Sequence, residues 1–325
     1  MDFIFENKFF IFLLGAMIAL SPAKASVLKT VAVTGAANYG TWDGKDYWIG
    51  SYGEGCVSKI SGDGIVLRTY RLGPGIFPVQ LAFDGTYIWV ASADPYDQLI
   101  RLSPITGKFT TVQLAPAGDG GRGGIQGVLW DGHNIWAGLS GLSEVAEINP
   151  DTGIVIASVK GQSNVNGLAY SYLSDTSTGK TTEYLWAADS DTIGKINAKT
   201  MSYNYVGEGQ GIFRLVIDGT YIYAQNANDS LIYKLDQQSG FLIATWKTGR
   251  APNDIAFDGN YIWTVSDDNF VTVHNRKTGL IVATIPNAGK SSLTFDGTHM
   301  WSVDDATATV YKLSIGQATL PLGDP

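Results

Sequence analysis

The chain has 325 residues, of which 45% are apolar, 16% are charged and 12% are aromatic, and its formal net charge is −8. The apolar fraction is that of a globular domain, which excludes a disordered chain. The low charge and the 39 glycines argue against long amphipathic helices and favour short strands joined by tight turns. The acidic balance, without a long basic run, argues against a nucleic-acid partner.

The first 25 residues have the pattern of an export signal. The apolar run Phe9–Leu20 is shorter than the ~20 residues that a membrane-spanning helix needs. Ala23 and Ala25 follow it at the spacing that signal peptidase accepts. We therefore predict a signal peptide at residues 1–25, no stable membrane insertion after cleavage, and a periplasmic or extracellular location; an uncleaved anchor is the alternative. Cys56 is the only cysteine, so an internal disulfide is excluded. We also expect the protein to be a monomer.

The rest of the chain consists of one repeated unit. Each copy reads strand, Asp-Gly turn, aromatic-rich strand, polar loop, strand, turn ending in glycine, and strand; the copy at residues 253–285 is the clearest. The Asp-Gly pairs begin at Asp43, Asp84, Asp131, Asp218, Asp258 and Asp296. Their separations are 41, 47, 87, 40 and 38 residues. The long gap holds a further copy, in which the insertion 171–183 replaces the turn and is expected to form a hairpin extension or loop.

These repeats predict an all-β fold. Asp-Gly between apolar runs is a strong hairpin signal, because the turn needs a positive φ. A unit of ~40–45 residues cannot bury both faces of its sheet alone, so such units pack radially into a ring. We predict a seven-bladed β-propeller of four-stranded antiparallel blades as the single domain of residues 26–325. We expect residues 29–34 to pair with residues 309–313, so that the N-terminal strand closes the ring.

The tryptophans are assigned to blade packing and not to a carbohydrate-stacking surface. Six of them share one position of the repeat, and Tyr223 takes that position in the remaining copy. They are Trp48, Trp89, Trp136, Trp186, Trp263 and Trp301.

The copy at residues 249–285 resembles the YVTN/NHL-type repeat propellers in its glycine, proline, strand, Asp-Gly turn and second hairpin. More distantly, the repeats are similar to the streptogramin B (virginiamycin B) lyases, seven-bladed propellers that open a cyclic depsipeptide with Mg²⁺, His and Glu. This resemblance implies a metal-dependent lyase or hydrolase as one interpretation. No glutamate occupies the positions that match the lyases' repeated Glu, and only Asp189 and Asp304 offer a carboxylate there. They are the candidates for binding Ca²⁺ or Mg²⁺; otherwise no cofactor is expected.

The candidate ligand-binding residues lie where the first strand of each copy begins, at the face opposite the Asp-Gly turns. They are Tyr39, Gln80, Gln126, Asn166, Arg214, Arg250, Asn253 and Asp254. Such side chains give directional hydrogen bonds to a small polar molecule, for example a sugar or a peptide. No catalytic residue is assigned. The leading interpretation is an exported binding or protein-interaction scaffold; a solvated funnel without a ligand, a lyase or hydrolase, and a structural envelope component remain open.

Overall fold

The computed structural model describes residues 25–93, 98–114, 124–161, 164–175 and 177–316. The predicted signal peptide lies outside the described residues except for Ala25. The only helical element in these ranges is the 3₁₀ turn η1 (Ser140–Leu142), and every other element is a β-strand. No helix in these ranges is long and apolar enough to cross a membrane.

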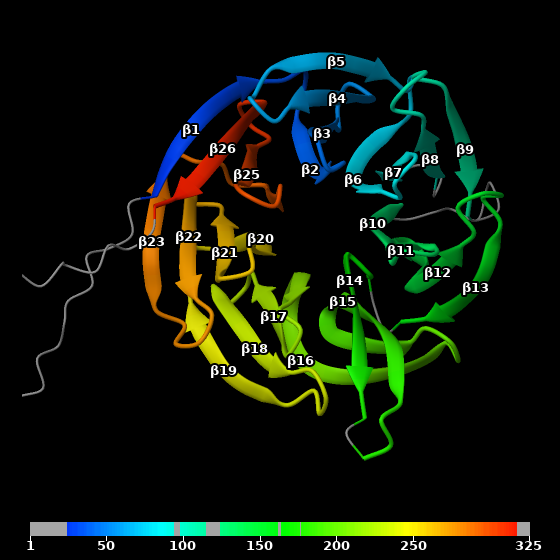
Figure 1. The fold of residues 1–325 in the computed structure, drawn as a ribbon, viewed down its shortest axis with the longest axis vertical. Helices are drawn as coiled ribbons and strands as arrows, with labels where there is room; N and C mark the ends of the chain where they lie inside the picture. Colours follow the sequence, from blue (N-terminus) through cyan, green and yellow to red (C-terminus); the bar gives the residue numbers. More distant parts are fainter. Residues whose placement is uncertain (1–24, 94–97, 115–123, 162–163, 176, 317–325) are drawn as a thin grey trace, which may run out of the picture.

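The strands form five four-stranded sheets and one six-stranded sheet, all antiparallel between neighbours. Four of the four-stranded sheets follow the chain order without a crossover. The first comprises β2 (Ala37–Trp42), β3 (Asp46–Ser51), β4 (Cys56–Ser61) and β5 (Val66–Arg71), and the second comprises β6 (Phe77–Phe83), β7 (Ile88–Ala93), β8 (Gln98–Leu102) and β9 (Phe109–Gln113). The third comprises β10 (Ile125–Trp130), β11 (Ile135–Leu139), β12 (Glu144–Ile148) and β13 (Val155–Lys160). The fourth comprises β20 (Pro252–Phe257), β21 (Tyr261–Ser266), β22 (Phe270–Asn275) and β23 (Ile281–Pro286). Figure 1 shows the first strand of each beside a central axis and the fourth on the circumference.

The fifth four-stranded sheet joins the two ends of the described chain. Its strand order is β1-β26-β25-β24, from β1 (Ala25–Ala32), β26 (Thr309–Ile315), β25 (Met300–Asp304) and β24 (Ser292–Phe295). Lys29 lies opposite Lys312, and Ala32 opposite Thr309, so the expected pairing is present for residues 29–32, while the strand begins at Ala25 and ends before residues 33–34. The Lys312 ammonium also donates to the Gly62 carbonyl at 2.6 Å. Hydrogen bonds therefore connect the last sheet to the first.

The six-stranded sheet contains two long strands that change partners. It comprises β14 (Gly167–Ser174), β15 (Thr181–Asn197), β16 (Ser202–Ile217), β17 (Tyr221–Asn226), β18 (Leu231–Asp236) and β19 (Leu242–Lys247). Strand β15 pairs with β14 as far as Ala188 and with β16 from Ser190. Strand β16 changes to β17 at Ile212. If each long strand is counted twice, this sheet equals two four-stranded units; the number of seven blades stays a prediction of the repeat.

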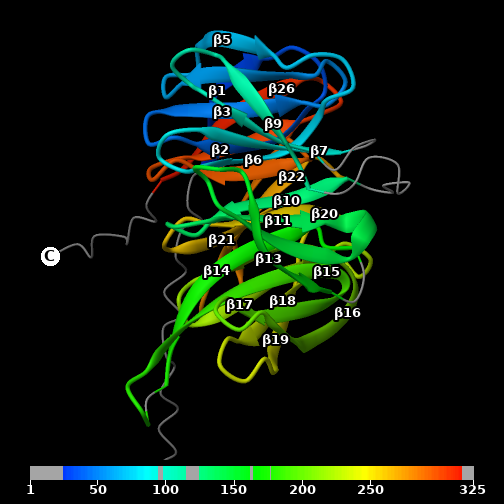
Figure 2. The ribbon, with the colours of Figure 1, turned by 90° about the vertical axis from the view of Figure 1, so that its right-hand side faces the viewer.

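The insertion at 171–183 extends the hairpin of β14 and β15. Pairing continues from Ser171 opposite Tyr184 to Ser174 opposite Thr181, and the hairpin projects from one side of the ring (Figure 2). The Asp175 carboxylate accepts the Ser177 N–H at 2.8 Å and the Ser177 hydroxyl at 2.6 Å. These bonds lower the pKa of Asp175 to about 2. The extended hairpin is one of the two forms that the sequence predicted.

In the Asp-Gly turns the glycine supplies a positive φ, and the aspartate carboxylate accepts hydrogen bonds. In the first turn, Gly44 has a φ of +91°, while the Asp43 carboxylate accepts two backbone N–H groups and the Trp48 indole N–H. The equivalent indoles bind their aspartates at 2.6 to 2.8 Å. In the copy with the insertion, the Ser171 hydroxyl accepts the Trp186 indole N–H at 2.9 Å. The buried tryptophans therefore hold six inner hairpins together, and the Tyr223 hydroxyl bonds Asp218 in the same way at 3.0 Å, consistent with their assignment to packing.

Candidate functional site

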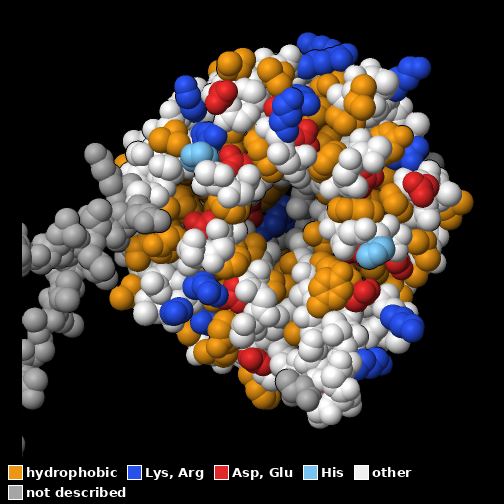
Figure 3. Space-filling model, viewed as in Figure 1, with side chains coloured by type: hydrophobic (Ala, Val, Ile, Leu, Met, Phe, Trp, Pro, Cys, Tyr) orange, Lys and Arg blue, Asp and Glu red, His pale blue; other side chains and the backbone are white. Residues whose placement is uncertain are grey.

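The channel floor is formed by residues four positions before the Asp-Gly turns. The Arg214 guanidinium, from β16, lies over the Tyr39 ring, from β2, at 4.0 Å between its central carbon and the ring centroid. The glycine at position 167 permits this crossing. A Cβ there would lie 2.6 Å from the Phe213 carbonyl oxygen and 3.2 Å from the Arg214 Cδ. Figure 3, which views the face that carries the Asp-Gly turns, shows a central hollow with a Lys or Arg side chain inside it.

Asp254 completes this cluster from β20. Its side chain is buried, with Oδ1 accepting the Ile255 N–H at 2.8 Å and Oδ2 accepting the Leu293 N–H at 2.7 Å. Burial raises the pKa of Asp254 to about 6, although the Arg214 charge opposes the shift. Burial likewise raises the pKa of Tyr39 to about 12. Three of the eight candidate residues thus lie together: the buried Arg214 and Asp254 and the half-buried Tyr39, which we call the channel cluster.

Three buried polar atoms around the channel cluster have no hydrogen-bond partner among the described residues. They are the Tyr47 hydroxyl, the Arg214 Nε and the Gln225 Oε1. Buried polar groups are nearly always satisfied, by ordered water where protein groups are absent. The sequence analysis did not select Tyr47 or Gln225, because both lie on second strands.

Above the channel cluster lies a polar cavity of about 280 Å³ at the face opposite the Asp-Gly turns. We call it the mouth cavity; its lining residues are Asn38, Tyr39, Asn253, Asp267, Lys290, Ser291 and Asp305. Tyr39 belongs to both features, because its hydroxyl donates to the Asn253 carbonyl at 3.1 Å. Tyr39 and Asn253 are the two candidate residues that line the cavity.

Hydrogen bonds hold the walls of the mouth cavity in place. The Asn253 Nδ2 donates to Asp267 Oδ1 at 2.6 Å and to the Lys290 carbonyl at 2.8 Å. The Ser291 hydroxyl donates to Asp305 Oδ1 at 2.7 Å and accepts the Asp305 N–H at 3.0 Å. Side chains fixed before binding lose little further entropy when a ligand arrives. The cavity is therefore preorganised for polar recognition.

Four candidate residues lie outside the mouth cavity and the channel cluster. The Gln80 Oε1 accepts the Val128 N–H at 3.4 Å and so connects β6 to β10. The Asn166 Nδ2 donates to the Ser190 hydroxyl at 2.8 Å. Gln126 is half-buried on β10 and Arg250 is exposed. These residues were candidates because of their position in the repeat, but the sequence could not show which of the candidates lie close together in space.

The two candidate metal ligands are engaged in local structure. Asp189 is fully buried, and its Oδ2 accepts the Tyr203 hydroxyl at 2.7 Å. The Asp304 Oδ1 accepts the N–H groups of Ala306 at 3.0 Å and Thr307 at 3.4 Å, which caps the turn after β25. Within the described ranges, no three His, Cys, Asp or Glu side chains form a group that could hold a metal ion.

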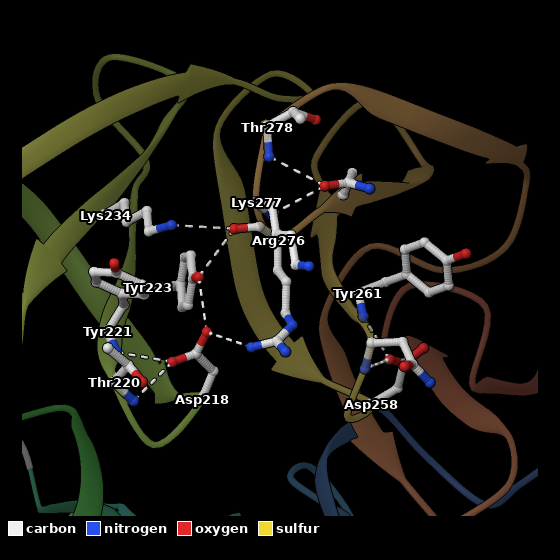
Figure 4. Close-up of polar contacts among 12 residues, drawn as sticks. Asp218, Thr220, Tyr221, Tyr223, Lys234, Asp258, Tyr261, Arg276, Lys277 and Thr278 are labelled. Atoms are coloured by element: carbon white, nitrogen blue, oxygen red, sulfur yellow. Dashed lines mark hydrogen bonds and ion pairs between the residues drawn. The ribbon is translucent and has the colours of Figure 1, made fainter. Parts of the chain in front are cut away.

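A second polar cluster lies at the Asp-Gly face and joins neighbouring sheets (Figure 4). The Asp218 Oδ2 accepts the Tyr223 hydroxyl at 3.0 Å and the Arg276 Nη1 at 3.1 Å, and the Lys234 ammonium donates to the Arg276 carbonyl at 3.2 Å. Burial works against the Asp218 charge, but hydrogen bonds from Tyr221, Thr220, Tyr223 and Arg276 outweigh it and lower the pKa of Asp218. Every group in this cluster has a partner inside it, which indicates a structural role.

Sheets arranged radially around an axis, with their first strands innermost, define a β-propeller. No protein-family description matches the sequence. No curated protein matches it either. Among solved structures, the chain is similar to selenomethionine-substituted virginiamycin B lyase from Staphylococcus aureus, with a TM-score of 0.71 and 16% identity over 90% of this chain and 99% of that chain. This likeness shows the fold alone, and since 1360 chains of solved structures match, the fold does not select a function.

Proposed function

We propose that this chain is an exported, non-catalytic β-propeller that binds a small polar ligand at the mouth cavity. The observation that carries the proposal is a preorganised polar cavity above the Tyr39–Arg214–Asp254 cluster. Ligand sites are concave and contain a few fixed polar groups, often beside residues with perturbed pKa values. The apolar run at residues 9–20 and the Ala23-Lys24-Ala25 sequence that follows it support export.

Binding has better support than a metal-dependent lyase or hydrolase reaction. The carboxylates of Asp189 and Asp304 already accept hydrogen bonds from Tyr203 and from a turn, in two different sheets. His274 is fully buried, and its two ring nitrogens contact the Thr272 hydroxyl and the Gly279 carbonyl. General acid–base catalysis needs a titratable group within reach of the substrate. The titratable groups of the mouth cavity, Asp267, Lys290 and Asp305, lie in a different part of the molecule from Asp189 and His274, so they do not complete a lyase-like set with them.

The test is a thermal-stability screen of the mature chain against sugars, amino acids, short peptides and divalent cations. A ligand at 100 times its Kd adds about 2.7 kcal/mol to the free energy of unfolding. We expect at least one polar compound to raise the Tm of the wild type but not of the Asp305→Ala variant. Asp63→Ala is the matched control, because Asp63 is also an exposed turn aspartate. Stabilisation that is unchanged in Asp305→Ala would place the ligand elsewhere and contradict the proposal.

A further inference from the structure

The chemistry of the mouth cavity narrows the class of ligand, an inference that rests on the proposed function. We infer that the mouth cavity binds a neutral polyhydroxylated unit, a single sugar ring, and not an anion, an ammonium group, a metal ion or a peptide. The inference depends on the hydrogen-bonding capacity that the lining residues retain, on their charges and on the size of the cavity.

The retained capacity is mainly that of acceptors. Asn253 uses its amide nitrogen for Asp267 and the Lys290 carbonyl, so the capacity that it retains is that of its amide oxygen, an acceptor. The hydrogen bonds found among the described residues use Oδ1 of Asp267 and Oδ1 of Asp305. The Oδ2 atoms of both carboxylates therefore add two strong acceptors. Hydroxyl groups supply the matching donors, and each hydroxyl can also accept a bond from the Lys290 ammonium.

The charges of the cavity oppose an anion, and the Lys290 ammonium opposes a cation placed beside Asp305. Two carboxylates, from Asp267 and Asp305, face one ammonium, from Lys290, so a ligand anion would meet like charge. The Lys290 Nζ lies 4.0 Å from Asp305 Oδ1 and repels a second cation there. The Arg214 guanidinium already covers a face of the Tyr39 ring, which leaves no free aromatic cage for an ammonium ligand. A neutral ligand meets none of these penalties.

The size and lining of the cavity favour a sugar ring over a peptide. A volume of about 280 Å³ lies just below the ~300–1,000 Å³ of drug-sized ligand pockets, which suits one small ring. All of its lining side chains are polar, so an apolar peptide side chain would find no surface to bury against. A free monosaccharide and the terminal residue of a glycan share the chemistry that this cavity recognises.

Isothermal titration calorimetry of the mature chain tests the inference. The probes are D-glucose, D-galactose, D-mannose and N-acetyl-D-glucosamine, with choline, acetate, CaCl₂ and triglycine as the competing classes. We expect at least one sugar to bind, with a loss of about tenfold or more in affinity in Asp267→Ala and Asp305→Ala, because each removes a charged acceptor. Asp63→Ala should bind like the wild type. If the matching methyl glycoside also binds, the source is a glycan terminus; if only the free sugar binds, the source is a monosaccharide.

The outcomes separate the inference from the proposed function. Binding of choline, CaCl₂, acetate or triglycine that is lost in Asp305→Ala, without binding of any sugar, overturns the sugar inference and leaves a ligand-binding mouth. Sugar binding that is equal in wild type, Asp267→Ala and Asp305→Ala overturns the site. If none of the probes binds, the sugar inference and the proposed function both fail. Circular dichroism of each variant confirms that its fold is retained.

Discussion

The change Asp258→Ala tests the hydrogen bond between indole and aspartate that recurs in the inner hairpins. The Asp258 Oδ2 accepts the Trp263 indole N–H at 2.7 Å, and its Oδ1 accepts the backbone N–H groups of Asn260 and Tyr261 at 2.8 and 2.7 Å. Trp263 is only 2% exposed, so its indole N–H cannot exchange the carboxylate for water. The change Asp258→Ala therefore leaves a buried donor without a partner and removes the cap of the turn.

The expected loss follows from these contacts. A hydrogen bond to a charged group contributes about 1.5–3 kcal/mol when one partner is buried. The N–H of the exposed Asn260 regains water, so the turn adds only about 1 kcal/mol. We expect Asp258→Ala to lower the free energy of unfolding by about 2.5–4 kcal/mol. Asp258→Asn keeps a side-chain oxygen and should lose less.

Urea unfolding followed by far-UV circular dichroism measures this difference. The control Asp63→Ala changes an exposed turn aspartate and should stay within about 0.5 kcal/mol of the wild type. If Asp258→Ala also stays within about 0.5 kcal/mol, the indole–carboxylate bond does not stabilise the hairpin and the reasoning is refuted.

Four further changes have defined outcomes. Deleting residues 25–32 removes β1 and exposes the edge of β26, so the Tm should fall sharply; an unchanged Tm would contradict closure of the ring by β1. The mature protein should not open cyclic depsipeptides with Mg²⁺; robust turnover that is lost in Asp189→Ala or Asp304→Ala would overturn this expectation. Replacing residues 172–182 by an Asp-Gly turn should leave the protein folded by circular dichroism, since that hairpin projects from the ring; an unfolded product would show that the hairpin is needed. Burial lowers the pKa of His274, so the unfolded chain binds the proton more tightly than the folded chain does. Stability should therefore decrease as the pH is lowered through the unfolded value of about 6.5. His274→Gln should lose less stability than the wild type between pH 7 and pH 5 in urea titrations; an identical pH dependence would contradict it.

The sheets could be predicted because their determinants are local. Each Asp-Gly pair marks the turn of one hairpin, and the spacing of about 40 residues between pairs gives the length of each repeated unit. The bond from indole to aspartate was not predicted, although the constant five-residue distance from Asp43 to Trp48 and from Asp258 to Trp263 carried the signal. The two long strands β15 and β16 were missed because the sequence places turns but does not show where a strand passes continuously from one unit to the next.

The site was predicted less completely than the fold for a physical reason. Strand alternation left two adjacent positions of each first strand as candidates for facing the channel, and Tyr39, Arg214 and Asp254 belong to one of these sets. Whether two such residues touch depends on the radius of the ring and on the room left between inner strands. The contact between Arg214 and Tyr39 depends on Gly167, a residue that supplies space and no chemistry. Such a contribution cannot be read from the residues that carry charge.

Hydrogen-exchange mass spectrometry of the mature protein, with and without the compound that most raises its Tm, tests ligand binding at the mouth cavity most directly. The account predicts added protection confined to the segments that form the cavity, residues 36–40, 250–254, 265–269, 288–292 and 303–306. Asp305→Ala should abolish that protection. Protection at the outer strands β5, β9, β13, β19 and β23, or at the Asp-Gly turns, would instead show recognition through the edges or the opposite face and contradict the account.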